Sequence, residues 1–308
     1  MYFLNALPGA VAEGLIWGLM AIGVYISYKI LDIADLTVDG SICTGACVCI
    51  MAISAGLPVW LSMILALLAG MLTGVVTGLL HTALGIPAIL AGILTQLMLY
   101  TVNLSILGGK SLQTVNARAV PLLLHMSNNN GAIIAAGAIV VLVIVCLRLF
   151  FYTEVGLTLK STGDNPDMSR AQGVNVELNK VIGLAIANGI VALAGALLAQ
   201  YKGSASINDG RGAIVIGLAA IFIGLSVSMK IKSNFVVSLI GVIGGGIIYY
   251  VIYNFVILMG LKTDYLKMLS AIIVAIFLAV PYLKGKYFTK QKALPVEVCP
   301  DAGGGTNA

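Results

Sequence analysis

Residues 161–201 read STGDNPDMSRAQGVNVELNKVIGLAIANGIVALAGALLAQY. The second half of this stretch, residues 181–201, is apolar and uncharged. At about 20 residues, it is long enough for an α-helix to cross the roughly 30 Å hydrocarbon core of a bilayer. The first half is polar, although the whole chain is 60% hydrophobic and only 9% charged. The stretch therefore combines a candidate membrane span with a polar segment, residues 161–176, which is called the polar island below.

Similar apolar runs recur along the 308 residues and predict an all-α, polytopic integral membrane protein. A soluble protein carries charge on about a quarter of its residues, and a β-barrel would show alternating strands of about ten residues. We expect about 8–10 transmembrane helices in a single transmembrane domain, 1–284, with a polar, disordered tail at 285–308. The expected spans are residues 10–28, 42–55, 59–80, 86–107, 132–151, 181–201, 213–228, 235–258 and 266–283.

The second span is unusual because it follows an acidic stretch, and Asp39 stands beside Gly40 at its start. An acidic residue beside a glycine break predicts a discontinuous or re-entrant helix, whose backbone ends can contact a solute. Two topologies follow from this. If the segment crosses fully, there are nine spans and the N-terminus is outside; if it is a half-helix, there are eight and the N-terminus is inside.

The distribution of the 17 Lys and Arg residues predicts the orientation. Eleven lie on one side, at positions 29, 148–180, 230–232 and 284–292, which places loop 152–180 and the C-terminus in the cytoplasm. Glycines four residues apart at Gly70, Gly74 and Gly78, and again at Gly241 and Gly245, predict close helix contacts, either within one chain or between two copies.

The polar island predicts a short helix with well-defined ends. Asn165 is a suitable N-cap, Pro166 suits the first helical position and Gly173 suits a left-handed C-cap. A helix this short needs a surface to pack against, which could be the membrane, the underside of the protein or a soluble partner. Lys and Arg equal Asp and Glu in number from 148 to 180, and this balance favours a protein partner over anionic lipid.

Residues 154–203 also resemble a known family. They are similar to the signature region of permease subunits of ABC importers, in the branch that contains the branched-chain amino acid and ribose-type permeases. In that family a cytoplasmic ENP…A…GIN loop precedes a span ending in AGxAGxLLA. The matching positions here are Asp164-Asn165-Pro166, Ala171, Gly173-Val174-Asn175 and residues 194–199. Residues 31–41 and 210–224 resemble a largely uncharacterised, amino-acid-type subfamily, and the likeness covers most of 10–284.

The resemblance implies the transmembrane subunit of an ATP-driven importer in the plasma membrane of a prokaryote. It implies as partners a second copy, membrane lipid, a cytoplasmic ATPase subunit that uses ATP and Mg, and an extracytoplasmic solute-binding protein. The cargo would be a small polar solute: an amino acid, aromatic ones included, is favoured, and nucleosides and sugars are left open. The island would be the coupling helix that docks on the ATPase, through Asp164, Asn165, Pro166, Asp167, Met168, Arg170, Ala171, Gly173 and Val174.

The chain itself shows no catalytic constellation, so we expect no enzyme activity and no cofactor or metal bound by this chain. Residues 104–111 end in Gly-Lys-Ser but lack the leading glycine of a phosphate loop. The spacing of Cys43, Cys47 and Cys49 could suit a soft metal, but packing between helices explains it as well. Scattered basic residues without interleaved aromatics exclude nucleic acid as a partner.

Polar residues inside apolar spans face protein or a water-filled path, because lipid does not solvate them. They either form hydrogen bonds between helices or mark the translocation path. The path candidates are Asp39, Ser41, Thr44, Gln96, Asn188 and Asn254. The rival function is a secondary transporter driven by an ion gradient, with Glu13 or Asp39 as its proton or sodium site.

Overall fold

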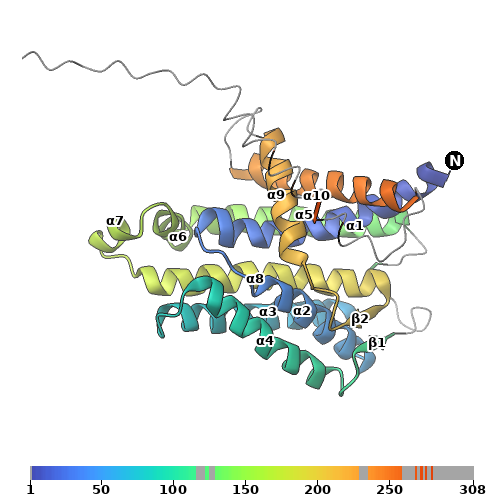
Figure 1. Cartoon of the computed structure of the whole chain (residues 1–308), viewed down its shortest axis with the longest axis horizontal. Coiled ribbons are helices and arrows are strands. Elements are labelled where there is room, and N and C mark those ends of the chain that lie inside the picture. Colours follow the sequence, from blue (N-terminus) through green and yellow to red (C-terminus); the bar gives the residue numbers. More distant parts are fainter. Residues whose placement is uncertain are drawn as a thin grey trace, which may run out of the picture.

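The computed structural model describes residues 2–115, 122–124, 129–228 and 235–258, and isolated positions 268, 271, 272, 275 and 279. Most of the long helices run along one direction, with α6 and α7 at one end and a small β-sheet at the other (Figure 1). These are called the α7 end and the sheet end below. The tail 285–308 and most of the expected span 266–283 lie outside the described residues.

The order of elements in the described residues is that of a helical membrane protein. They are α1 (Tyr2–Tyr25), the π-helix η1 (Ile26–Ile30), α2 (Val38–Ser54), α3 (Val59–Thr82), α4 (Ala88–Ile106), β1 (Leu112–Thr114), α5 (Asn129–Tyr152), α6 (Glu154–Asp164), α7 (Pro166–Ala171), α8 (Val176–Lys202), β2 (Ser204–Ser206), α9 (Ala213–Ser228) and α10 (Phe235–Leu258).

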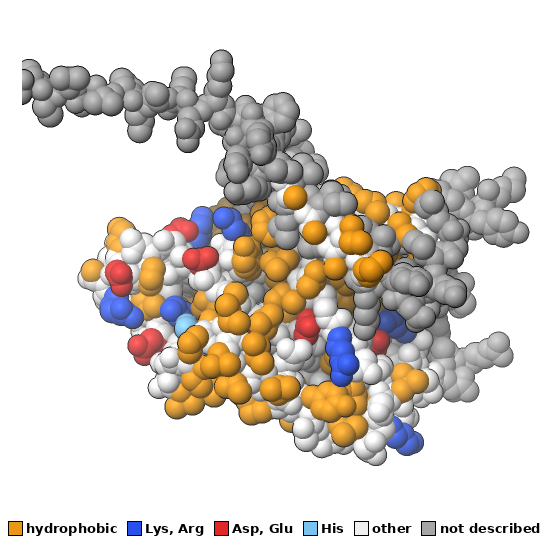
Figure 2. All heavy atoms as spheres, in the orientation of Figure 1, with side chains coloured by type: hydrophobic (Ala, Val, Ile, Leu, Met, Phe, Trp, Pro, Cys, Tyr) orange, Lys and Arg blue, Asp and Glu red, His pale blue; other side chains and the backbone are white. Residues whose placement is uncertain are grey.

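Six helices in the described part of the chain are long and apolar enough to cross a bilayer, and α2 and α9 are shorter apolar helices. Hydrophobic side chains cover much of the visible face of the bundle, whereas charges gather at the α7 end (Figure 2). The all-α polytopic fold is therefore confirmed. The sheet was not predicted; β1 and β2 pair antiparallel, with Leu112 opposite Ser206.

Helix α1 crosses the whole bundle. At the sheet end, a Cβ on Gly9 would lie 3.5 Å from the amide nitrogen of Asn129 and 3.6 Å from the hydroxyl of Tyr201. At the α7 end, Gly163 of α6 packs directly against the carbonyl oxygen of Ile30. The start of α1 and the polar segment around α7 therefore lie at opposite ends of the molecule.

The break in the second segment is real, but it lies earlier than expected. The non-helical residues are 31–37, with Asp32 at a positive φ of 55°, whereas Asp39 and Gly40 lie in the first turn of α2. Gly40 does not interrupt the helix. Glycine is needed there for close packing, because a Cβ would lie 2.8 Å from Leu99 of α4.

Helix α2 starts halfway along the bundle, since Ser41 in its second turn contacts Asn188 in the middle of α8. It then runs to the sheet end, where Ala46 and Cys47 pack in one cluster with Ala199 and Ala205. The broken segment thus still completes a crossing. Of the two topologies that the sequence left open, this geometry fits the one in which the second segment crosses fully, because the start of α1 and α7 lie at opposite ends of the bundle.

Helix α8 is the central element and is buried along most of its length (Figure 1). Gly70, Gly74 and Gly78 of α3 all pack against its backbone or side chains; a Cβ on Gly78 would lie 2.9 Å from the Cα of Val181. Gly245 of α10 packs in the same way against α9 at Ala220. Both predicted glycine faces therefore make contacts within one chain.

Candidate functional site

The polar segment forms two helices rather than a loop with one. Residues 154–164, expected to be loop, form α6, and Thr153 caps it by accepting a 3.3 Å hydrogen bond from the amide of Gly156. Two glycines in eleven residues obscure its helical character in the sequence. Both are needed for close contact: Gly156 packs on the backbone at Phe150, and Gly163 on that at Ile30.

Helix α7 has the ends that the sequence predicts. The side-chain oxygen of Asn165 accepts a 3.0 Å hydrogen bond from the amide of Met168, and Pro166 occupies the first helical position. Gly173 has a φ of 83°, and the next amide, of Val174, donates to the carbonyl oxygen of Ser169 at 3.1 Å. Backbone and cap together hold this six-residue helix in a defined shape.

One side of α7 is anchored and the other is free. Ser169 is buried and donates to the carbonyl of Asn165 at 3.0 Å and to the hydroxyl of Ser161 on α6 at 3.2 Å. Met168 is 60% exposed. Arg170 forms an exposed 3.7 Å ion pair with Asp167. The remaining predicted coupling residues, Asp164, Ala171 and Val174, are exposed or half-buried beside them.

In the middle of the bundle, the side chain of Asn188 on α8 joins three segments. Its amide nitrogen donates to Asp35 at 2.6 Å and to the carbonyl of Leu184 at 3.0 Å. Its oxygen accepts a 2.6 Å hydrogen bond from Ser41 on α2, and the Ser41 hydroxyl lies 2.7 Å from that of Thr73 on α3. Asp35, Ser41, Thr73 and Asn188 are all buried.

The network continues from Asp35 through a row of threonines. The other carboxylate oxygen of Asp35 accepts a 2.9 Å hydrogen bond from the amide of Thr37. The hydroxyls of Thr37 and Thr77 lie 2.8 Å apart, and Thr77 donates to Thr95 on α4 at 3.1 Å. These hydrogen bonds connect the break with α3 and α4. Asp35 and the threonines were not among the predicted site residues, because their local signal was only the Asp-x-Thr spacing of an Asx turn.

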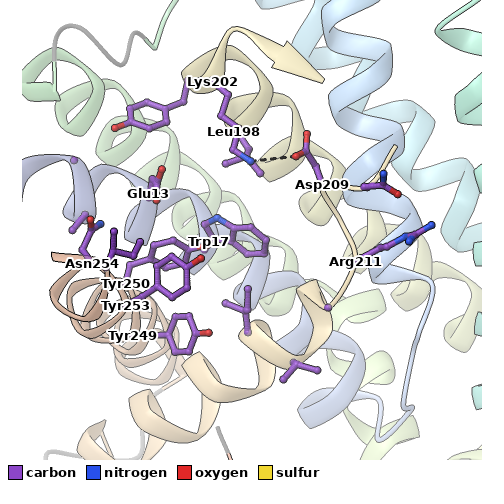
Figure 3. Close-up of a pocket in the computed structure, with 18 of the residues that line it drawn as sticks. Glu13, Trp17, Leu198, Lys202, Asp209, Arg211, Tyr249, Tyr250, Tyr253 and Asn254 are labelled. Carbon is purple, nitrogen blue, oxygen red and sulfur yellow. Dashed lines mark hydrogen bonds and ion pairs between the residues drawn. The ribbon is translucent and has the colours of Figure 1, made fainter. Parts of the chain in front are cut away.

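A cavity of about 740 Å³ opens at the sheet end. Figure 3 shows its aromatic wall of Trp17, Tyr249, Tyr250 and Tyr253, with Glu13 beside it. Trp17 and Tyr250 stack with ring centroids 5.7 Å apart. The cavity is also lined by Lys202 and Asp209, which form a 3.3 Å ion pair, by Arg211, and by the amides of Asn129, Asn208 and Asn254.

A second pocket, of about 200 Å³, lies between α2 and α4 and is called the α2–α4 pocket below. Asp39, Gln96, Asn103 and Arg211 line it. Asp39 accepts 2.9 Å hydrogen bonds from the amides of Gly212 and Ile214 and so caps the start of α9. The first turns of α2 and α9 therefore meet at this carboxylate.

Cys43 holds the loop before α9 against α2. Its sulfur accepts a 3.0 Å hydrogen bond from the amide of Gly210 and donates a 3.2 Å one to the carbonyl of Ile207. Cys43, Cys47 and Cys49 are all buried, which suits the packing interpretation of these cysteines.

The six predicted path residues do not form a single site. Asp39 and Gln96 line the α2–α4 pocket, and Asn254 lines the sheet-end cavity. Ser41 and Asn188 belong to the buried network, where both make hydrogen bonds between helices. Thr44 donates to the carbonyl of Gly40 at 3.0 Å within its own helix.

Comparison with known proteins agrees with this architecture. Residues 9–280 match the family described as "Branched-chain amino acid transport system / permease component". A "Tyrosine transport system permease protein" of Clostridioides difficile is 35% identical over 282 residues, which cover 90% of this chain and 91% of that protein. An uncharacterised protein of Rickettsia prowazekii is 31% identical over 278 residues, covering 90% and 98%. No solved structure matches the chain.

The family match spans almost all of the described helices, including the break before α2 and the α6–α7 segment. The sequence resemblance, which covered most of residues 10–284, is therefore confirmed. Relatives of this kind are transport subunits rather than enzymes. The chain is a multi-pass membrane permease and belongs to the branched-chain amino acid transport system permease family.

Proposed function

We propose that this chain is the transmembrane subunit of an ATP-driven importer of an amino acid, and that two copies form the path. The name of the Clostridioides difficile relative favours tyrosine as the cargo. Nucleosides and sugars are the other cargoes that the sequence left open. ATP and Mg are used by a separate ATPase subunit, and an extracytoplasmic binding protein delivers the solute.

The exposed side of α7 is the observation that carries this proposal. Helix α7 stands at the very end of the bundle (Figure 1). Its buried Ser169 fixes it to α6, and α6 is in turn fixed to the bundle by a 3.2 Å hydrogen bond from Asn179 to Thr162. Met168 nevertheless points away from the protein and is 60% exposed. A rigidly held helix that offers an apolar side chain fits docking into a groove of a partner.

The orientation follows from the same assignment. With the ATPase on α7, the α7 end faces the cytoplasm of a prokaryotic cell, as does the C-terminus, and the sheet end faces outward. The cavity lined by Trp17, Tyr250 and Tyr253 then opens toward the binding protein. Its aromatic wall suits a cargo with an aromatic ring, because offset and edge-to-face ring contacts stabilise such complexes.

Reconstitution tests the proposal directly. The permease is placed in lipid vesicles with its ATPase and binding protein, and uptake of labelled L-tyrosine is measured with ATP, with a non-hydrolysable ATP analogue and without nucleotide. We expect uptake only with hydrolysable ATP and all three components. Vesicles that lack the ATPase are the control.

An ion-coupled secondary transporter would give the opposite pattern. Uptake that persists without ATP and follows an imposed proton or sodium gradient would refute the proposal. In that event Glu13, which lines the sheet-end cavity, becomes the first residue to replace. Uptake of a pentose or a nucleoside in place of the amino acid would refute only the choice of cargo.

A further inference from the structure

The α2–α4 pocket contains one positive and one negative side chain that do not pair with each other. Arg211 and Asp39 both line it. The ion pairs of the described residues are Asp167 with Arg170 and Asp209 with Lys202, so neither Arg211 nor Asp39 takes part in one. Arg211 is exposed, and in Figure 3 its side chain extends away from Tyr249, Tyr250 and Tyr253.

An unused hydrogen-bond acceptor lies in the same pocket. Asn103 on α4 is only 1% exposed, and its side-chain oxygen has no hydrogen-bond partner among the described residues. Leaving a buried acceptor unpaired costs free energy, so such a group in a pocket indicates a missing donor. Gln96, two turns earlier on the same helix, adds a further amide to this wall.

The carboxylate of Asp39 uses part of its hydrogen-bonding capacity within the protein. It already accepts hydrogen bonds from the amides of Gly212 and Ile214. Each carboxylate oxygen can accept more than one hydrogen bond, so Asp39 keeps capacity toward the pocket. Its negative charge also makes this side of the pocket favourable for a cation rather than for a second carboxylate.

From this arrangement we infer that the α2–α4 pocket binds the charged head group of an α-amino acid. Arg211 forms an ion pair with the substrate carboxylate. The Asn103 oxygen and the Asp39 carboxylate, which line the same pocket, accept hydrogen bonds from the substrate ammonium. The inference rests on the proposed transport of an amino acid and adds to it the site within the permease. A head group with two opposite charges is the ligand that satisfies all three side chains at once.

The size of the pocket supports a head group rather than a whole aromatic substrate. About 200 Å³ is smaller than the roughly 300–1,000 Å³ of pockets that enclose drug-sized ligands. Arg211 also lines the much larger sheet-end cavity. A solute entering from that cavity can therefore meet the guanidinium first.

Equilibrium binding in the absence of the binding protein tests the inference. The full-length permease and its ATPase are placed in lipid nanodiscs, and tritiated L-tyrosine is displaced by three unlabelled probes. The probes are L-tyrosine, tyramine, which lacks the carboxylate, and 3-(4-hydroxyphenyl)propionate, which lacks the ammonium. We expect each singly charged probe to bind at least about tenfold more weakly than L-tyrosine, since each loses a charge-assisted contact.

The variants assign each charge to its residue. Arg211→Gln should weaken L-tyrosine about tenfold and leave tyramine unchanged, and Arg211→Lys should restore part of the loss. Asn103→Leu should weaken L-tyrosine and leave 3-(4-hydroxyphenyl)propionate unchanged, whereas Asn103→Asp should retain binding because it keeps the acceptor. Lys110→Gln and Ser105→Ala are matched controls, since Lys110 is exposed in the loop after α4 and Ser105 is exposed on α4 itself.

Three results would overturn the site. The first is an Arg211→Gln variant that binds L-tyrosine as tightly as the wild type does. The second is a loss of all three probes by the same factor in both variants, which indicates a structural effect. The third is an absence of saturable binding to the wild-type complex. If ATP-driven uptake persists in that case, the site is wrong and the proposed function stands; if uptake is absent too, the function fails on its own test.

Discussion

The carboxylate of Asp35 and the side-chain amide of Asn188, far apart in the sequence, meet in a 2.6 Å hydrogen bond inside the bundle. Asp35 lies in the break between η1 and α2, and Asn188 in the middle of α8. The contact fixes the break against the most buried helix of the protein. It also joins α2 and α3 to the same point, through Ser41 and Thr73.

Removing either partner of this contact should destabilise the protein. Asp35→Leu and Asn188→Leu each leave a buried polar group without its partner, at a cost of about 1–3 kcal/mol. The double variant should cost less than the sum of the two single variants, because Asp35 and Asn188 no longer leave each other unpaired. Thermal unfolding of the detergent-purified protein measures all three, and strictly additive losses would show that the two side chains are not coupled.

The interface between α3 and α8 should not accommodate even one additional methyl group without loss of stability. A Cβ on Gly74 would meet the carbonyl oxygen of Leu184 and lie 2.7 Å from the Cα of Ala185. We expect Gly74→Ala to destabilise the protein by about 1–3 kcal/mol, as overpacking does. Gly137→Ala on α5 is the matched control, because a Cβ there has nothing within 4 Å. Equal melting temperatures for the two variants would contradict the close packing.

The cap that Asp39 provides for α9 can be tested by hydrogen exchange. Asp39→Ala removes the acceptor of the Gly212 and Ile214 amides, each bonded at 2.9 Å. Loss of a helix cap costs about 1 kcal/mol, so these amides should exchange about fivefold faster. Asp39→Asn keeps one acceptor oxygen, so its exchange rates should lie between those of the wild type and those of Asp39→Ala. Unchanged exchange at 212–214 in the Ala variant would rule out the cap.

On α7, introducing a charge at position 168 should weaken ATPase binding more than removing the charge at position 170. Met168→Asp places a charge on the exposed apolar side chain that we propose docks on the ATPase, and burying it unpaired is costly. Arg170→Ala removes only an exposed ion pair, typically worth about 0–1 kcal/mol. We expect Met168→Asp to abolish co-purification of the ATPase and Arg170→Ala to reduce it little. Normal melting of both variants in detergent is the control; a Met168→Asp protein that retains the ATPase would refute docking.

The turn after α7 should depend on its glycine. Gly173 has a φ of 83° and open space around it, so a substitution there acts through the backbone alone. Gly173→Val should cost roughly 1 kcal/mol or more and change the direction in which α7 leaves toward α8. ATPase retention should fall while the melting temperature of the membrane part changes little. A variant that retains both would show that the shape of this turn is not needed for docking.

Most of the described spans were predictable because they are uninterrupted apolar runs. The expected ranges 213–228 and 235–258 coincide with α9 (Ala213–Ser228) and α10 (Phe235–Leu258). The ends of α7 were predictable for a different reason. Asn165, Pro166 and Gly173 act through their own backbone and nearest neighbours, so their roles are local.

The contacts between distant segments were not predictable. Asn188 was singled out as a polar residue within a span, but nothing local connects it with Asp35 across 153 positions. The break was placed at Gly40 because glycine interrupts helices, whereas this glycine serves contact with Leu99. The unpaired oxygen of Asn103 is likewise a property of packing, since the sequence shows only an amide in an apolar run.

The uninterrupted length of α8 has a mechanical consequence. It begins directly after the α7 turn and continues for 27 residues to Lys202, about 40 Å in all. Near its middle, α8 is in close contact with Gly70 of α3, which packs against the backbone of Asn188. If α8 moved as one rigid body about this point, a tilt of about 10° would move each end by about 3.5 Å in opposite directions. Rigid-body movement of α8 would therefore carry a displacement at Val176 to Lys202, which lines the sheet-end cavity, in the opposite direction.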